Sequence, residues 1–349
     1  MPSTLNRRVA VWSDVAGLLS SFDLKRDQLL TTANPKTARD GRQRIAIHHG
    51  MPARGLARQC DPATAATTKT RGFIQSVADL AERHGMRAAV ARHNGCRFAT
   101  PGCAEACLGF SGHGGMSVDV AACRGRRTMA RLADPVTYGR SILWAACGEL
   151  AAARAAGLPF ALRCNGTDEH AWHRLTFPVT VADAVAIRRR YGVDVATGEA
   201  LTLADALRAF NDDVNLYEYL KAPVDGVDGL KAWRAAGWDV TASFAADRPS
   251  ACADAIAAVR AGFRVAVPVA ISKGAPIPSR VTITAGGQSV TLATVDGDAS
   301  DARFRDPGAV AVILRAKRSR GADPTAAGRF ILPDRARVDL FDGFVEFCA

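Results

Sequence analysis

The chain has 349 residues, 48% of them hydrophobic, and is long enough for one large α/β domain or two smaller ones. No stretch approaches about 18 consecutive apolar residues, and the N-terminal segment has no uninterrupted apolar run, so neither a membrane span nor a signal peptide is indicated. The nine cysteines are odd in number and mostly dispersed, which argues against a secreted disulfide framework and predicts a cytoplasmic protein.

The positive charge is concentrated in the N-terminal part of the chain. Residues 1–150 contain 21 Lys and Arg against 11 Asp and Glu, whereas residues 151–349 contain 24 against 23. Such a basic half favours a polyanionic partner, first of all nucleic acid. Arg124, Arg126 and Arg127 form the tightest basic run, and we expect them to contact a phosphate backbone. The alternative is that the charge serves solubility alone.

The sequence pattern of the first half of the chain predicts few regular elements. Residues 1–70 are expected to form a basic, loosely structured arm, because their turn-like and small polar stretches offer little for a core. Residues 71–85 have helical periodicity. After the cysteine-containing segment, two further helices are expected over residues 117–133 and 136–157, the second ending at a glycine shortly before a proline.

The second half alternates between strands and helices. Short apolar runs predict strands over residues 160–164, 215–220, 238–244, 263–271 and 310–314. Helical patterns lie between the earlier strands, near residues 181–191, 201–211, 226–236 and 250–262. This alternation is typical of a parallel sheet. We therefore predict a single α/β domain over residues 71–349 with a TIM-type or partial βα barrel, and an open doubly wound sheet as the second choice.

Three cysteines lie within twelve residues, at Cys96, Cys103 and Cys107, on a Gly- and Pro-containing loop. Thiolates this close together on irregular backbone can bind one ion or cluster. Two interpretations fit the spacing: three ligands to a [4Fe–4S] cluster with one iron open, or three of four ligands to zinc, with His113 or Cys123 as the fourth. A further interpretation is that the three cysteines are reduced, buried thiols that bind no metal.

Polar residues follow the predicted strands. Asn165, Thr167 and Asp168 follow the strand over 160–164, Lys221 follows the next strand, and Ser243 ends the third. In a βα barrel these strand ends converge on one face, together with the cysteine loop. We therefore expect Asn165, Asp168 and Lys221 to be catalytic, and Asn165, Thr167 and Ser243 to bind a cofactor. Helix capping or turn formation is the alternative for each residue taken alone.

The segment from Asp296 to Asp306 is a second concentration of polar residues. Its carboxylates superficially resemble a calcium loop, but Asp301 and Pro307 replace the Gly and Glu that an EF-hand requires. Asp296 and Asp298 could instead bind Mg²⁺ at the rim of a barrel. A turn-rich loop whose carboxylates pair with an arginine is the other interpretation.

The paired histidines His48 and His49 lack the spacing of a nicking motif, since no hydrophobic residue separates them. His170 and His173 follow the strand over 160–164 and could contact a substrate, although solvated loop histidines are more common. None of these histidines is assigned a role from the sequence.

The chain also contains five distinctive blocks: CRFATPGCAEACLGFSGHG, RCNGTDEHAWH, YEYLK, DVTASFAADRPS and VDGDASDARFRDPGAVAVILRAK. Over residues 30–332 these blocks resemble the "gene product eighty-eight-like" domains of phages and plasmids, whose function is unknown. If the gene belongs to a phage, the resemblance implies the cytoplasm of the host cell.

The cysteine loop is more distantly similar to that of the radical-SAM barrels, in which three loop cysteines hold a [4Fe–4S] cluster and S-adenosylmethionine (SAM) chelates the open iron. The chain differs from those barrels in two places. The C-x3-C-x2-C spacing is absent, with Phe110 where the third ligand would fall, and Asn165 to Asp168 stands in place of a Gly-Gly-Glu segment.

Three functional classes follow from these patterns. The first is an iron–sulfur, radical-SAM-like enzyme acting on a nucleotide, a nucleic acid or a small metabolite. The second is a zinc-stabilised nucleic-acid-binding protein without catalytic activity. The third is a metal-free barrel enzyme, a hydrolase or transferase that uses its carboxylates.

Overall fold

A computed structural model describes residues 10–32, 41–52, 55, 77–105, 107, 117–316 and 330–348. The chain divides into two compact units. Unit 1 comprises Met1–Ala33, Gly41–Gly95 and Ser117–Leu216, and unit 2 comprises Asn34–Asp40, Cys96–Met116 and Tyr217–Ala349. Strand β5 (Val214–Leu220) contributes its first residues to unit 1 and its last to unit 2.

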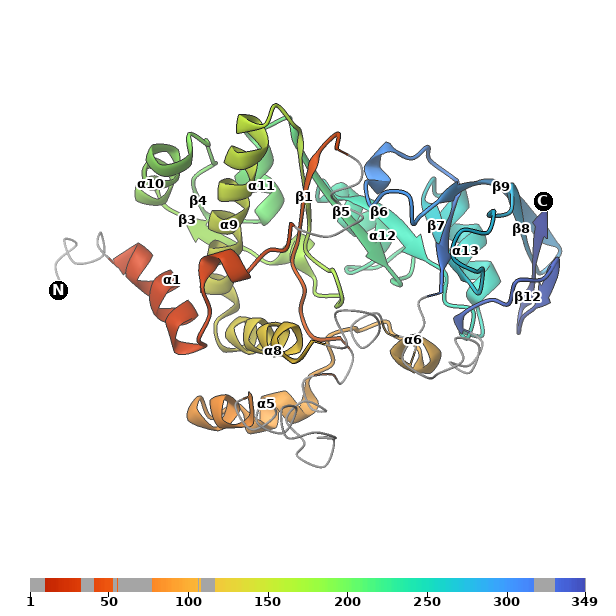
Figure 1. Cartoon of the computed structure of the whole chain (residues 1–349), viewed down its shortest axis with the longest axis horizontal. Coiled ribbons are helices and arrows are strands. Elements are labelled where there is room, and N and C mark those ends of the chain that lie inside the picture. Colours follow the sequence, from red (N-terminus) through yellow and green to blue (C-terminus); the bar gives the residue numbers. More distant parts are fainter. Residues whose placement is uncertain are drawn as a thin grey trace. The chain divides into compact units, whose positions relative to one another are not determined.

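Unit 1 is built on a short parallel sheet. Strand β1 (Arg44–Ile47) pairs with β2 (Phe160–Arg163), and β2 pairs with the first part of β5. Helix α9 (Pro135–Ala155) packs against β1 and β2 (Figure 1). It begins where the side chain of Asp134 accepts a hydrogen bond from the Thr137 amide, and most of its residues are buried. This buried helix covers the sheet and forms the core of the unit.

Helix α8 (Val118–Ala133) begins at Ser117, whose hydroxyl accepts a hydrogen bond from the Val120 amide, and it packs on α9. Arg124, Arg127 and Arg131 lie three and four residues apart along α8, so they share one face of the helix. All three are buried. Helix α8 therefore places a row of arginines inside unit 1.

The remaining elements of unit 1 surround this core. They are α1 (Ala10–Ser21), η2 (Arg26–Gln28), α5 (Arg87–Arg92), η4 (Trp172–Arg174), β3 (Phe177–Val179), α10 (Val181–Tyr191), β4 (Gly198–Leu201) and α11 (Leu203–Arg208). Strands β3 and β4 pair as a separate two-stranded antiparallel sheet. Helices α10 and α11 each begin with a capping box, from Thr180 with Asp183 and from Thr202 with Asp205.

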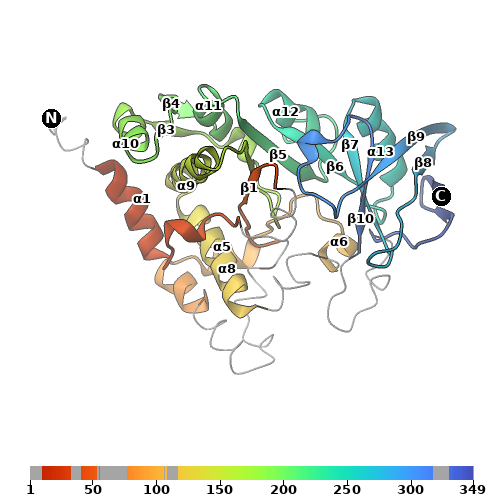
Figure 2. The same cartoon turned by 45° about the horizontal axis from the view of Figure 1, so that its top comes forward.

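Unit 2 continues from the last residues of β5 with parallel strands in the order β5-β6-β7-β10-β9. Strand β10 lies between β7 and β9 (Figure 2). The order then runs antiparallel through β8, β12 and β11. The bounds are β6 (Asp239–Ser243), β7 (Arg264–Val269), β8 (Arg280–Ala285), β9 (Gln288–Asp296), β10 (Ala311–Arg315), β11 (Arg337–Asp339) and β12 (Gly343–Cys348).

Three short helices and a longer one accompany the strands of unit 2. They are α6 (Pro101–Glu105), α12 (Leu230–Ala235), η5 (Arg303–Arg305) and α13 (Ala251–Arg260). Helix α12 packs against β6, and α13 packs against β7, β8, β9 and β12. Strands β5, β6 and β7 thus alternate with helices along the chain, as in βαβ units.

An α/β fold with a mostly parallel sheet is confirmed. A closed TIM-type barrel is not found among the described residues, since β1 and β11 stand at opposite ends of the strand order and do not pair with each other. The antiparallel strands β8, β11 and β12 had no counterpart in the sequence prediction. No helix in the described part of the chain is long and apolar enough to cross a membrane.

We expected residues 1–70 to form a loosely structured basic arm. The described parts of that segment contain regular elements instead. Residues 10–32 and 41–52 contain α1, η2 and β1, and the interior of β1 is buried. The run Arg44 to Ile47 forms a strand because its apolar side chains are covered by α9. Residues 1–9, 33–40 and most of 53–76 lie outside the described residues.

Candidate functional site

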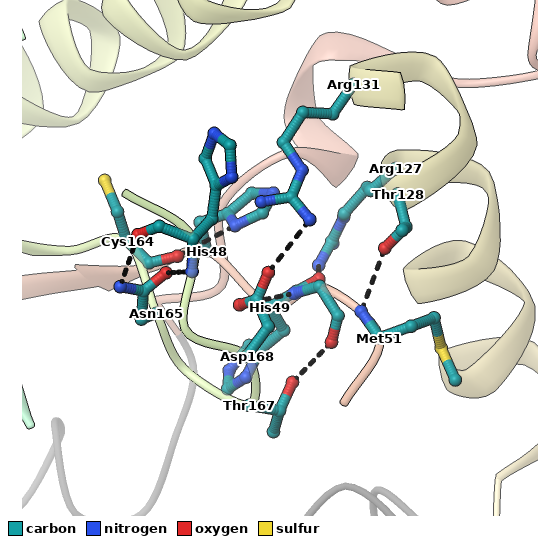
Figure 3. Close-up of polar contacts among 12 residues, drawn as sticks. His48, His49, Met51, Arg127, Thr128, Arg131, Cys164, Asn165, Thr167 and Asp168 are labelled. Atoms are coloured by element: carbon teal, nitrogen blue, oxygen red, sulfur yellow. Dashed lines mark hydrogen bonds and ion pairs between the residues drawn. The ribbon is translucent and has the colours of Figure 1, made fainter. Parts of the chain in front are cut away.

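The loops that follow β1 and β2 bind each other at the carboxyl ends of these two parallel strands (Figure 3). The Gly166 amide donates to the His48 carbonyl at 2.8 Å, and the Thr167 hydroxyl donates to the Gly50 carbonyl at 2.7 Å. The Gly50 amide donates in turn to Asp168 Oδ1 at 3.3 Å. Carboxyl ends of neighbouring parallel strands are where α/β proteins bind ligands. We call this region the β1–β2 site.

Two glycines allow this close approach. A Cβ atom on Gly50 would lie 2.2 Å from Asp168 Oδ2, and one on Gly95 would lie 1.8 Å from the Met51 carbonyl oxygen. Both distances are far shorter than any real contact, so a side chain at either position would force the loops apart. The loops of the β1–β2 site are therefore closely packed, against the Asp168 side chain at Gly50 and against the Met51 backbone at Gly95.

His48 is fully enclosed in this site. Its Nδ1 lies 2.9 Å from the Cys164 carbonyl oxygen and its Nε2 lies 2.9 Å from the Tyr138 hydroxyl. Burial, with Arg127 and Arg131 adding to it, holds the pKa of His48 well below its usual value, so the ring is neutral. Because a carbonyl only accepts, Nδ1 carries the proton and Nε2 accepts from Tyr138. His48 is thus locked in one tautomer.

Arg131 and Asp168 form the central ion pair, with Nη2 and Oδ2 3.4 Å apart and side-chain exposures of 4% and 0%. The contact has ion-pair distance but not hydrogen-bond geometry, since Oδ2 makes no hydrogen bond in the described part of the chain. Burial raises the pKa of Asp168 to about 6, although the Arg131 charge opposes that rise. Asp168 is therefore a carboxyl that can exchange a proton near neutral pH.

Asn165 closes the loop after β2. Its side-chain amide donates to the His170 carbonyl at 3.0 Å and its Oδ1 accepts from the His170 amide at 3.0 Å. The Glu169 amide donates to the Gly95 carbonyl at 2.7 Å. In this structure Asn165 and Thr167 hold backbone segments together, while Asp168 pairs with Arg131.

Further basic and neutral donors surround the pair. Arg127 Nη1 donates to the His49 carbonyl at 3.3 Å. Four buried nitrogens make no hydrogen bond within the described residues: Arg127 Nε, Arg131 Nη1, His49 Nδ1 and His170 Nε2. Burial, reinforced by neighbouring arginines, lowers the pKa of His49 and of His170 well below the usual value. The site therefore combines permanent positive charge with neutral imidazoles.

In unit 2 the cysteine loop is attached to the carboxyl ends of β5 and β6. The Thr100 hydroxyl donates to Asp247 Oδ1 at 2.6 Å, and the Gly102 amide donates to Asp247 Oδ2 at 2.8 Å. Arg248 Nη2 donates to the Phe98 and Lys221 carbonyls, each at 3.1 Å. Asp247 thereby satisfies an amide at the start of α6, and the loop is held where β5 and β6 end.

The three cysteines of this loop differ in exposure: Cys96 is buried, whereas Cys103 and Cys107 are partly exposed. Within the described residues, no three His, Cys, Asp or Glu side chains are grouped so as to hold a metal ion. Of the two residues proposed to complete a zinc site, His113 lies outside the described residues. Cys123 belongs to unit 1, where its Sγ lies 3.7 Å from the Gln28 carbonyl oxygen.

Lys221 and Ser243 line one pocket of unit 2 together with Arg248 and Asp254. The cavity volume is about 30 Å³, which is room for roughly two water molecules. The structure thus brings Lys221 and Ser243 together, as expected for the ends of neighbouring parallel strands.

Asp296 and Asp298 take part in a compact turn after β9. Arg315 Nη1 donates to both carboxylate oxygens of Asp296, at 2.7 and 2.8 Å, and the Arg315 amide donates to Asp298 Oδ2 at 3.0 Å. Arg303 pairs with Asp306 at 2.9 Å. The segment therefore has the arginine-paired carboxylates of a structural loop.

The arginines expected to contact nucleic acid are divided between two faces of α8. Arg124 and Arg127 are buried, whereas Arg126 is partly exposed and donates to the Asp23 carbonyl at 3.5 Å. The sequence analysis missed Arg131, His48 and His49 as members of the site. The spacing of Arg124, Arg127 and Arg131 by three and four residues was the available signal for a common helix face.

Comparison with known proteins adds one match. The model of a family described as Gene product 88 matches residues 54–330, which is more than half of the chain. No match is found among curated proteins or among solved structures.

Proposed function

The chain belongs to the Gene product 88 family, and we propose that it is an iron–sulfur, radical-SAM-like enzyme acting on a nucleotide, a nucleic acid or a small metabolite in the cytoplasm. The observation that carries the proposal is the strand order. In both units the parallel strands up to β7 lie beside one another in chain order, β1-β2-β5 and then β5-β6-β7, and β10 is inserted between β7 and β9. The cysteine loop follows β1, and its attachment lies at the carboxyl ends of β5 and β6.

This order favours a partial βα barrel as the finer description of the fold. An open doubly wound sheet reverses its strand order at a switch point, whereas a singly wound barrel does not. Here the order from β1 to β7 has no such reversal within either unit, and it first changes beyond β7, where β10 lies between β7 and β9. The place of the cysteines after the first strand, and of Asn165 to Asp168 after the second, matches the resemblance to radical-SAM barrels.

The donor set suits an iron–sulfur cluster: Cys96, Cys103 and Cys107 are three thiols on one loop. They would hold the cluster, which when bound with SAM would supply one-electron cleavage of the sulfonium. Asp247 and Arg248 restrain the loop that bears these thiols. The chain's own contribution is to position the loop and exclude water from it.

Each unit also offers residues suited to acting on a substrate. Lys221 and Ser243 line the pocket beside Arg248, where a cationic amine and a hydroxyl can orient a polar group. Asp168, with its pKa near 6, can accept or release a proton. Asn165 and Thr167 hold the loop that carries Asp168.

Anaerobic purification with iron and sulfide analysis tests the proposal. We expect a brown protein with about four irons per chain. Changing Cys96, Cys103 or Cys107 to Ala should remove iron to a similar degree, whereas Cys348→Ala, at an exposed cysteine, should leave it unchanged. A colourless wild-type protein, or full iron occupancy in Cys103→Ala, would overturn the proposal.

A zinc-stabilised nucleic-acid-binding protein is the second candidate, and the excess of basic residues over residues 1–150 favours it. One zinc per chain without iron, together with nucleic-acid binding that weakens steeply with salt, would support it. Of the three arginines first expected at the interface, Arg126 is the one whose exposure suits a phosphate backbone.

A further inference from the structure

We propose that the β1–β2 site binds a terminal phosphate group of the substrate, through Arg127 and Arg131 on α8 with His49 and His170 from the two loops. The ligand is a phosphate monoester, such as a nucleoside monophosphate or a phosphorylated nucleic-acid end. This assignment deepens the proposed function and, as a substrate site, rests on it. Binding of phosphate itself does not require the cluster.

The first support is uncompensated buried charge. Arg127 and Arg131 are 6% and 4% exposed. Within the described residues, Arg131 has one carboxylate within ion-pair distance, Asp168, and Arg127 has none. Burying a guanidinium without a counter-charge is costly, and the cost is relieved when an anion binds. Burial also raises the pKa of Asp168, which weakens the one counter-charge present.

The second support is the set of unused donors. Arg131 Nη1, Arg127 Nε, His49 Nδ1 and His170 Nε2 are buried and make no hydrogen bond within the described residues. A guanidinium N–H only donates, and each neutral imidazole can place its proton on the free nitrogen. Arg131 comes from α8, and His49 and His170 come from the two loops, so a single ligand that satisfies all three must offer several acceptor oxygens.

Phosphate meets these demands better than the alternatives. A metal ion is disfavoured because Arg127 and Arg131 are permanent positive charges beside the imidazoles. A carboxylate has only two oxygens, whereas a phosphate monoester offers three terminal oxygens and matches the fork of a guanidinium.

The burial of the arginines also selects a terminal group over a continuous backbone. A phosphodiester backbone runs along a protein surface and is contacted by exposed cations. Arg127 and Arg131 are on the buried face of α8, while Arg126 is on the partly exposed one. A single phosphate needs only one cluster of donors, whereas a strand of nucleic acid cannot follow buried side chains.

The test uses the full-length protein and inorganic phosphate as the first probe. We expect phosphate to raise the melting temperature of the wild type and to bind measurably by calorimetry. Arg131→Gln should weaken binding at least tenfold, whereas Arg126→Gln, on the same helix but the other face, should leave it unchanged. No phosphate binding by the wild type, or an equal loss in both variants, would overturn the inference.

Two further arms identify the source of the phosphate and guard against misfolding. A nucleoside monophosphate and a 5′-phosphorylated oligonucleotide should compete with phosphate, and a 5′-hydroxyl oligonucleotide should not. If Arg131→Gln does not fold, His170→Asn should weaken binding instead, and unchanged affinity there would overturn the inference. A protein without iron that binds phosphate would refute the proposed function and leave this site standing; an iron-containing protein that does not bind phosphate would do the reverse.

Discussion

The Arg131 guanidinium and the Asp168 carboxylate lie 3.4 Å apart, with 4% and 0% of their side chains exposed. Arg131 comes from α8 and Asp168 from the loop after β2, so the pair connects the helix row of arginines to the carboxyl end of the sheet in unit 1. A buried ion pair contributes little net stability, because desolvation offsets the attraction. The pair therefore matters more for how it positions charge than for how strongly it holds the fold.

Removing one partner of this pair should be far more damaging than the pair's net contribution. Asp168→Ala removes the acceptor of the Gly50 amide together with the carboxyl beside Arg131, and we expect a loss of about 3 kcal/mol in the free energy of unfolding. The matched control is Asp213→Ala, which breaks the partly exposed pair with Arg154 and should cost about 1 kcal/mol or less. Urea denaturation measures both, and equal losses would contradict the assignment of Asp168 as the central counter-charge.

Acid should destabilise unit 1 between pH 6.5 and about 4. Burial lowers the pKa of His48, His49 and His170 well below 6.5 and that of His93 to about 4. In that range the unfolded chain binds more protons than the folded one, so stability falls as the pH falls. Asp168 acts in the opposite direction between about pH 4 and 6, because its folded pKa is raised. Because four histidines have lowered pKa values and only Asp168 has a raised one, the net effect of acid is a loss of stability.

His93→Gln tests this pH dependence directly. The variant removes one group that must be neutral in the folded state, so its unfolding free energy should decline less between pH 6.5 and 4 than that of the wild type. His84→Gln, at an exposed pairing with the Ser21 carbonyl, provides the comparison. Parallel curves for wild type and His93→Gln would show that His93 does not contribute.

Much of the parallel sheet could be predicted from the sequence because its strands are buried on both sides. Strands β2, β5, β6, β7 and β10 are short apolar runs bounded by turns or helices, and their observed bounds agree closely with the expected ones. The strand β1 was missed because four residues within a polar segment carry too weak a pattern. Its partner β2 and helix α9, distant in sequence, provide its burial.

The candidate site likewise contains residues that the sequence could predict and residues that it could not. Asn165, Thr167 and Asp168 were selected because they follow a recognisable strand, and the structure places them in the β1–β2 site. His48 and His49 could not be selected, since their role depends on β1, which was not expected. Lys221 and Ser243 line a separate pocket in unit 2. The spacing of the cysteines suits iron and zinc alike, because thiolates bind both metals.

Two Gly→Ala substitutions should have opposite effects on stability, one at a closely packed loop and one within a helix. Gly95→Ala would place a Cβ 1.8 Å from the backbone oxygen of Met51, so the loop must move and the protein should lose stability, by several kcal/mol. Gly148→Ala lies within α9, where the new Cβ would contact the Tyr191 ring at an ordinary 3.5 Å. There we expect a gain of about 0.5–1 kcal/mol, because alanine favours a helix. Thermal denaturation decides, and a stable Gly95→Ala protein would contradict the packing of the β1–β2 site.

The last prediction concerns the attachment of the cysteine loop. Asp247 accepts hydrogen bonds from the Thr100 hydroxyl and the Gly102 amide, which lie immediately before and within the first turn of α6. Asp247→Ala removes both bonds, and caps of this kind contribute about 1 kcal/mol. Because the loss is local, we expect faster amide hydrogen exchange over residues 98–105 with little change in the sheet of unit 2.

The same variant should also lower the iron content if the loop holds a cluster, since Cys96 and Cys103 flank the attachment point. Asp225→Ala is the control, because Asp225 forms an exposed ion pair with Lys231 in the same unit. It should leave both the exchange rates of the loop and the iron content unchanged. Unaltered exchange in Asp247→Ala would refute the role of Asp247 as the anchor. Faster exchange with undiminished iron would mean that the cysteines hold the metal without support from Asp247.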